Sequence, residues 1–169
     1  ILSGLVGSEM CIRDRPSPDT SPMADGISIS IADRLTADDL RRIEALLPQL
    51  SATARFDSER VLSLLQAQNT DLFVARESGR IVGMATLVTA PLITGWHGSI
   101  EDVVVDQSTR GRGIARLLLE AIIDESQQRG LPTLDLTSRP SRESALRLYE
   151  SVGFVQRNTN VLRFAPQGD

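Results

Sequence analysis

The stretch VVVDQSTRGRGIARLLLEAII, residues 103–123, has the clearest pattern in the sequence. Three valines end an apolar segment and lead into a polar loop that contains two glycines and two arginines. Apolar residues then return at the spacing of one face of a helix. A buried strand, a cationic glycine-rich loop and a helix therefore follow one another, which is an arrangement that commonly binds an oxyanion at the helix N-terminus.

The segments on either side of this stretch alternate between strand and helix patterns. Strand patterns occupy 27–33, 71–88 with a hairpin turn at Ser78-Gly79, 99–106, 133–138 and, as a final pair, 154–164. Helix patterns occupy 36–50, 57–68, 111–129 and 141–151, and a loop is expected at 91–98. The order β-α-α-β-β-β-α-β-α-β-β predicts one α/β domain with a mixed sheet.

Residues at the ends of the helical segments are typical of caps. Thr36 precedes the first helix as an N-cap, and Asp57 or Ser58 does so for the second. Gly130, with Pro132 after it, ends the helix that follows the glycine-rich loop.

Composition excludes several classes of function. The chain has 169 residues, a net charge of −4 and 4% aromatic residues, so a nucleic-acid surface is not expected. No apolar run is long enough to span a bilayer. The single cysteine, Cys11, and the single histidine, His97, exclude a disulfide framework and a multi-His or multi-Cys metal site. Chemistry must then use carboxylates, Tyr149, hydroxyls, backbone amides or a cofactor.

The first 22 residues differ from the rest of the chain. They end in a Pro/Ser/Asp-rich run and have neither a periodic apolar pattern nor the basic start of a signal peptide. We expect residues 1–22 to be a non-native or disordered leader, and residues 23–169 to be the functional domain. Cys11 lies in the leader, so the domain itself has no cysteine, which suits a cytoplasmic protein.

The loop after the valines has the features of a phosphate site. Gly111 and Gly113 let the backbone approach an anion closely, while Arg110 and Arg112 add positive charge. The alternative is a tight turn in which the glycines satisfy only the backbone geometry. Neither a P-loop nor the three-glycine dinucleotide pattern is present.

Two motifs resemble those of the GNAT superfamily of N-acetyltransferases. Residues 110–115, RGRGIA, match the family's Arg-x-x-Gly-x-Gly/Ala loop, and RLYESVGF at 147–154 is similar to its LYEKLGF segment. The resemblance covers about residues 27–164. It implies an α/β fold with a mixed, mostly antiparallel sheet, a central splayed pair of parallel strands and about four flanking helices.

The resemblance also implies acetyl-CoA as the acyl donor, without a metal. The pantetheine arm would lie along Val103, Val104 and Val105, between the splayed strands. The pyrophosphate would contact the loop residues Arg110, Gly111, Arg112, Gly113, Ile114 and Ala115. One position departs from the family pattern: Arg142 stands where many members have Asn.

The resemblance further implies the groups that move protons. Tyr149 corresponds to the family's usual acid, although a packing role is the alternative. Strand alternation predicts Glu101, Val103 and Val105 on one face of the sheet, and Ile100, Asp102 and Val104 on the other. The segment IEDVVVD resembles the matching strand of polyamine and glucosamine-6-phosphate N-acetyltransferases. Glu101 is therefore the first candidate base and Asp102 the second, unless they are edge acids paired with arginine.

The predicted function is transfer of an acetyl group from acetyl-CoA to a primary amine, directly, in a ternary complex. The acceptor is a small molecule or a peptide, and a homodimer is left open. A catalytically silent CoA-binding regulatory or sensor module is the alternative. Trp96 could cover the acceptor or simply pack. His97 and Arg55 could also meet the acceptor, but an ordinary surface role is the preferred interpretation for both.

Overall fold

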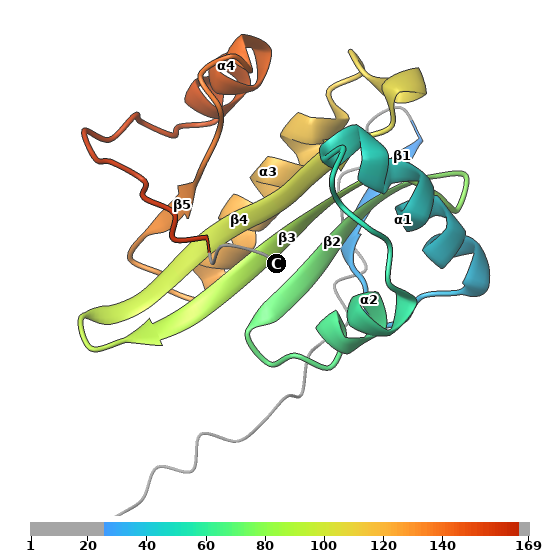
Figure 1. The fold of residues 1–169 in the computed structure, drawn as a ribbon, viewed down its shortest axis with the longest axis horizontal. Coiled ribbons are helices and arrows are strands. Elements are labelled where there is room, and N and C mark those ends of the chain that lie inside the picture. The colour runs from blue at the N-terminus through green and yellow to red at the C-terminus, as the bar shows by residue number, and fades with distance from the viewer. Residues whose placement is uncertain (1–25, 166–169) are drawn as a thin grey trace, which may run out of the picture.

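The computed structural model describes residues 26–165, and the expected leader at 1–22 lies outside them. A five-stranded sheet is flanked by helices on both faces (Figure 1). The strands are β1 (Ile27–Ile31), β2 (Thr70–Glu77), β3 (Arg80–Leu92), β4 (Gly95–Val105) and β5 (Leu134–Leu136). The helices are α1 (Ala37–Leu50), α2 (Ser58–Leu64), α3 (Ile114–Gln128) and α4 (Glu143–Ser151).

The sheet is mixed, as predicted. Its order is β1-β2-β3-β4-β5, with antiparallel pairs from β1 to β4 and one parallel pair, β4 with β5. Two apolar clusters fill its two faces. One contains Ile114, Leu118 and Ile122 of α3, and the other contains Ile43 and Leu46 of α1. The predicted parallel pair is present, but it lies at the edge of the sheet and not at its centre, because no strand follows β5 within residues 26–165.

Local signals at the helix ends are confirmed. The Thr36 hydroxyl accepts from the Asp39 N–H at 3.2 Å, and the Asp39 carboxylate accepts from the Thr36 N–H at 3.0 Å, which completes a capping box. Asp57 caps α2 through the Arg60 N–H. The predicted hairpin turn also forms, with Ser78 and Gly79 both at positive φ.

The expected loop at 91–98 is instead part of a long hairpin. β3 and β4 stay paired up to Leu92 and Gly95, so only residues 93 and 94 form the turn (Figure 1). Gly98 helps β5 to approach, because a Cβ there would lie 2.9 Å from Leu134 and 3.0 Å from Leu131. Pro91, Gly95 and Gly98 are thus all paired residues of this hairpin.

The predicted final strand pair at 154–164 is also wrong. Within the described chain no strand follows α4, and an ion pair from Arg157 to Asp135 at 3.0 Å ties this segment to β5. Its large apolar side chains lie in solvent: Val155, Val161, Leu162 and Phe164 are 77–91% exposed. The polar run between them, QRNTN, has low strand propensity, and β-propensity depends on a packed face that this segment does not reach.

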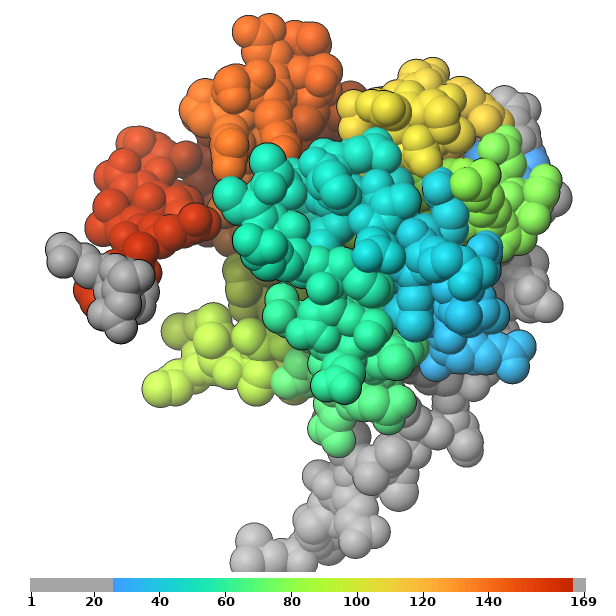
Figure 2. Space-filling view, turned by 45° about the vertical axis from the view of Figure 1, so that its right-hand side comes forward, coloured from blue at the N-terminus to red at the C-terminus, as the bar shows by residue number. Residues whose placement is uncertain are grey.

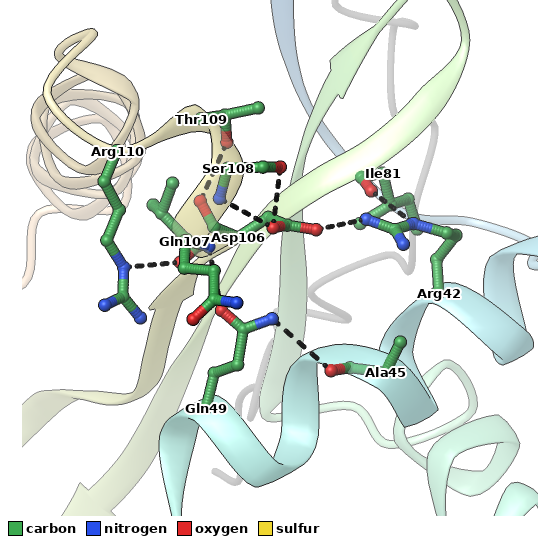
Figure 3. Close-up of polar contacts among 10 residues, drawn as sticks. Arg42, Ala45, Gln49, Ile81, Asp106, Gln107, Ser108, Thr109 and Arg110 are labelled. Atoms are coloured by element: carbon green, nitrogen blue, oxygen red, sulfur yellow. Dashed lines mark hydrogen bonds and ion pairs between the residues drawn. The ribbon is translucent and has the colours of Figure 1, made fainter.

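A polar network fastens α1 to the loop that follows β4 (Figure 3). Arg42 donates to the Asp106 carboxylate at 2.6 Å and to the Ile81 carbonyl at 3.1 Å. About two turns further along α1, the Gln49 side chain accepts from the Gln107 N–H at 2.8 Å. Because the Arg42 and Asp106 side chains are each only 14% exposed, this ion pair is poorly screened by solvent.

Asp106 should make folding stability sensitive to acid. Hydrogen bonds from the Ser108 N–H and from Arg42 lower the pKa of the Asp106 carboxyl to about 2, from 3.8. A lowered folded-state pKa stabilises the fold above the unfolded value, and this stabilisation is lost as the pH falls from about 4 to 2. It amounts to roughly 2 kcal/mol.

The check is urea unfolding at pH 5 and at pH 2.5. Asp106→Asn should show a smaller loss of unfolding free energy between the two pH values than wild type. Asp38→Asn is the matched control, because Asp38 forms only an exposed pair with Arg41. Equal acid sensitivity in wild type and Asp106→Asn would contradict the assignment.

Gly83 should tolerate a side chain less well than Gly98 does. A Cβ there would lie 3.1 Å from the Val104 carbonyl oxygen and 3.2 Å from the Val105 side chain. Backbone atoms cannot yield easily, so Gly83→Ala should destabilise the fold by about 1–3 kcal/mol. Gly98→Ala is the matched comparison, since its nearest neighbours are the flexible ends of two leucines. Thermal unfolding that ranks Gly98→Ala as the more harmful change would contradict this prediction.

Candidate active site

A β-bulge in β4 shapes the centre of the site. Met84 pairs with Val104 and Thr86 pairs with Glu101, so Ala85 alone faces both Asp102 and Val103. Asp102 takes a left-handed backbone conformation, with φ +54°. Glycine adopts this conformation at the least cost, and strained non-glycine residues are concentrated at functional sites.

The bulge corrects the predicted faces of β4. Ile100, Val103 and Val105 all pack in the cluster on the α3 side, whereas Val104 packs in the cluster on the α1 side. The expectation that Glu101 shares a face with Val103 and Val105 is therefore wrong. The reason is the extra residue at the bulge, which shifts the alternation by one position.

β4 and β5 part directly beside this bulge. Their pairing ends at Ile100 with Leu136, while β4 continues to Val105. A cavity of about 100 Å³ lies there, and the surface in Figure 2 is hollowed between the orange-red C-terminal part, the teal segment after α1 and the green hairpin. Its lining is formed by Leu50, Ile100, Glu101, Asp102, Val103, Leu136, Thr137, Arg142 and Tyr149. The three predicted catalytic residues thus meet in one cavity.

Tyr149 enters this cavity from α4. Its half-buried ring meets Phe154 edge-on, with centroids 6.4 Å apart and an interplanar angle of 70°. Burial raises the pKa of the Tyr149 hydroxyl, while the nearby Arg142 charge acts against that rise. The phenol therefore stays protonated at neutral pH and is able to donate a proton.

The two carboxylates stand on β4, at the opposite wall. Glu101 accepts from the Ser99 hydroxyl at 2.6 Å and, among residues 26–165, forms no ion pair with an arginine. Loss of hydration at the cavity wall raises the pKa of Asp102, and the Glu101 charge adds to the rise. Asp102 is thus the carboxylate whose proton affinity the fold shifts toward neutrality.

The loop before α3 leaves backbone donors available. In the part of the chain that the structure describes, the N–H groups of Gly111, Gly113, Ile114 and Ala115 donate no hydrogen bond. Both glycines have positive φ, +79° and +76°, and a Cβ on either would meet open space. A helix start with unused N–H groups and open room over its glycines is suited to an anion.

The two loop arginines are partly engaged elsewhere. Arg110 donates through Nε to the Val105 carbonyl at 3.1 Å, which leaves its terminal nitrogens available. Arg112 reaches back to the β2–β3 hairpin and pairs with Glu77 at 2.7 Å. Of the expected pantetheine residues, Val103 lines the cavity, whereas Val104 and Val105 are core side chains that can offer only backbone groups.

The cavity also contains residues that the sequence did not single out as part of a site. Leu50 ends α1, and Leu136 and Thr137 follow from β5; no motif marks any of them. Arg142 attracted notice only as a departure from the family pattern, and it donates to the Leu50 carbonyl at 3.1 Å. Trp96, His97 and Arg55 do not line the cavity. His97 is a strand residue whose ring nitrogen lies 3.0 Å from the Thr133 hydroxyl.

Residues 26–165 have neither a cluster of metal ligands nor a membrane-spanning helix. Between residues 26 and 165, no group of three or more His, Cys, Asp or Glu side chains is placed to hold a metal ion. Among the helices of the same residues, none combines the length and apolarity that a membrane span requires.

Comparison with known proteins gives concordant matches. Residues 38–154 match the model of the Acetyltransferase (GNAT) family. Glucosamine 6-phosphate N-acetyltransferase of Trypanosoma brucei brucei is 39% identical over 88 residues, which make up 50% of this chain and 58% of that protein. The ribosomal protein bS18 alanine N-acetyltransferase of Escherichia coli K12 is 32% identical over 105 residues, 60% of this chain and 68% of that protein.

A solved structure extends the similarity to the fold. The transcriptional regulator from Bacillus halodurans C-125 superposes with a TM-score of 0.72 and 26% identity, covering 82% of this chain and 99% of that one. Its sheet and helices therefore correspond to those described above over most of their length. With a family match that spans more than half of its residues, the chain belongs to the GNAT acetyltransferase family.

Proposed function

We propose that this protein is an N-acetyltransferase that moves an acetyl group from acetyl-CoA to a primary amine. The observation that carries the proposal is the cavity where β4 and β5 part, because it contains Glu101, Asp102 and Tyr149 together. A proton acceptor and a proton donor at opposite walls are what amine acetylation requires. The domain has no cysteine, so direct transfer in a ternary complex is favoured over a covalent enzyme intermediate.

The residues at the loop and the strand gap fit coenzyme A. The N–H groups of Gly111, Gly113, Ile114 and Ala115 would hold the pyrophosphate, with Arg110 adding charge. The unpaired edge of β4 beyond Ile100 would offer backbone groups of Val103 to the pantetheine arm. When bound there, acetyl-CoA supplies an activated thioester, so the protein need only position it and move protons.

The ionisable groups of the cavity then each accept or donate a proton. A Glu101 or Asp102 carboxylate oxygen accepts the proton that the acceptor ammonium must lose, directly or through water. Burial raises the pKa of Asp102, and repulsion from Glu101 adds to the rise, so Asp102 binds a proton more readily than an exposed aspartate does. The Tyr149 hydroxyl, kept protonated by burial, donates toward the leaving sulfur.

The named relatives support a primary amine as the acceptor. One acts, by its name, on an amino sugar phosphate and another on an alanine of a ribosomal protein. The matched segment spans 58% of the first relative, so neither acceptor is assigned to this chain. We propose the cytoplasm as the location of this protein, because the domain has no cysteine.

The second candidate is a catalytically silent CoA-binding regulator. It is favoured by the described role of the Bacillus halodurans structure, a transcriptional regulator that shares the fold. Against it stands the set of cavity groups, because a sensor that only binds CoA needs neither the carboxylates nor the tyrosine. Release of CoA thiol from acetyl-CoA in the presence of a panel of amines separates the two candidates.

Gly113→Val should abolish tight binding of acetyl-CoA. A β-branched residue at φ +76° is strained, and its methyl groups would occupy the open space beside the free N–H groups. Calorimetry should show a dissociation constant raised by roughly tenfold or more, the equivalent of about 1.4 kcal/mol. Gly130→Val, which has a similar φ of +64° at the far end of α3, controls for backbone strain. Unchanged affinity in Gly113→Val would remove the loop from the binding site.

Changes at the cavity walls should separate the acid from the base. Tyr149→Phe should lower kcat by roughly 10²–10⁴-fold and leave acetyl-CoA affinity intact, since only a proton donor is lost. Glu101→Gln and Asp102→Asn should lower kcat/KM most at low pH, where the amine is protonated, and less at high pH. If Asp102 is the base, Glu101→Gln should also shift the acidic side of the pH–rate profile to lower pH. The substitution removes the charge repulsion that contributes to the raised pKa of Asp102.

The measurement is a pH–rate profile for the three variants on an amine that the panel identifies. Wild-type turnover by all three across the whole pH range would mean that catalysis depends on positioning alone.

A further inference from the structure

Arg142 lines the cavity and has no carboxylate partner among residues 26–165, in contrast to Arg42 and Arg129. Arg42 pairs with Asp106 and Arg129 with Asp71, both at 2.6 Å. Arg142 forms no ion pair within residues 26–165, and its only side-chain hydrogen bond there goes from Nη2 to the Leu50 carbonyl at 3.1 Å. A guanidinium has five N–H donors, so most of its donor capacity and its full charge stay available.

Two neighbours, Leu50 and Tyr149, define the position of the Arg142 guanidinium. The bond to Leu50 joins the residue before α4 to the last residue of α1, and both residues line the cavity. Arg142 itself lines the cavity, and its charge is close enough to Tyr149 to oppose the rise of the tyrosine pKa. The guanidinium therefore lies at the tyrosine wall of the cavity.

The opposite wall carries the opposite charge. Glu101 and Asp102 project from β4 into the same space, whose volume is about 100 Å³. An ammonium group is attracted to the carboxylate wall, and an anionic group is attracted to the guanidinium wall. A guanidinium also matches the geometry of a carboxylate or a phosphate through two parallel hydrogen bonds. The cavity is thus complementary to a molecule that carries both charges within a short distance.

We propose that Arg142 is a specificity-determining residue that selects acceptor amines bearing a carboxylate or phosphate group, an inference that rests on the proposed acetyl transfer. The anionic group binds the free N–H donors of Arg142, and the amine end lies toward Glu101 and Asp102. A neutral amine of the same length lacks the first contact. The bond from Arg142 to Leu50 holds the guanidinium in place for this selection.

The test compares amines matched in length and differing in charge. β-Alanine is set against n-propylamine, and O-phosphoethanolamine against ethanolamine, so that carboxylate and phosphate are examined separately. Wild type should prefer the anionic member of at least one pair in kcat/KM. Arg142→Ala should reduce this preference by about 10- to 100-fold, the expected range for a hydrogen bond between charged groups.

Two other variants address structure and charge. Arg142→Lys keeps the charge but not the planar fork and should retain part of the preference. Arg139→Ala removes an exposed arginine from the same loop that does not line the cavity, so it should keep the wild-type preference. If Arg142→Ala does not fold, as judged by thermal unfolding, Arg142→Lys decides the question through its own partial loss.

Calorimetry with CoA-saturated protein gives a readout that does not depend on turnover. If no amine is acetylated but wild type binds an anionic amine that Arg142→Ala does not, the acceptor inference stands and the proposed transfer fails. If wild type acetylates neutral amines as well as anionic ones, or neither binds nor acetylates the anionic ones, the inference is overturned. A weaker affinity of Arg142→Ala for acetyl-CoA, with the preference unchanged, would assign Arg142 to the cofactor and also overturn it.

Discussion

The extra residue in β4 is the constraint on which the rest of the site depends. By placing Asp102 and Val103 opposite the single residue Ala85, the bulge turns the strand and ends its pairing with β5 after Ile100. The two parallel strands then part, and the cavity opens where a continuous sheet would have closed it. Without the bulge, strand alternation would place Val103 with Glu101 and away from the core that it packs against.

The same bulge directs some residues of β4 into the cores and others toward the cavity. Val104 and Val105 enter the two cores on opposite faces of the sheet and hold β4 from both sides. Between them and Ile100, Glu101 and Asp102 are left to face the cavity. This packing keeps the strained backbone of Asp102 in place. Ile100 and Val105 pack in one core and Val104 in the other, so the backbone between them cannot relax locally.

Ion pairs complete the positioning of the loop and the cavity. Arg42 and Asp106 fasten α1 to the start of the loop, and Arg112 with Glu77 holds its far side to the β2–β3 hairpin. These contacts fix the loop, while the N–H groups of Gly111, Gly113, Ile114 and Ala115 donate no hydrogen bond within residues 26–165. At the cavity, Arg142 differs from these arginines because it forms no ion pair within residues 26–165.

The sequence by itself determined the parts that depend on local chemistry. Thr36 and Asp57 cap their helices, Ser78-Gly79 turns the hairpin, and the loop RGRGIA precedes a helix, because each effect involves residues within a few positions of one another. The family resemblance correctly identified the mixed sheet with its parallel pair.

Three features of the sheet were not predictable from the sequence, because strand pairing joins residues that are distant in sequence. They are the bulge in β4, the continuation of β3 and β4 through 91–98, and the absence of strands at 154–164 within the described chain. For the same reason no sequence pattern could bring Leu50, Asp102, Arg142 and Tyr149 to one cavity, since three separate elements must pack before these side chains meet.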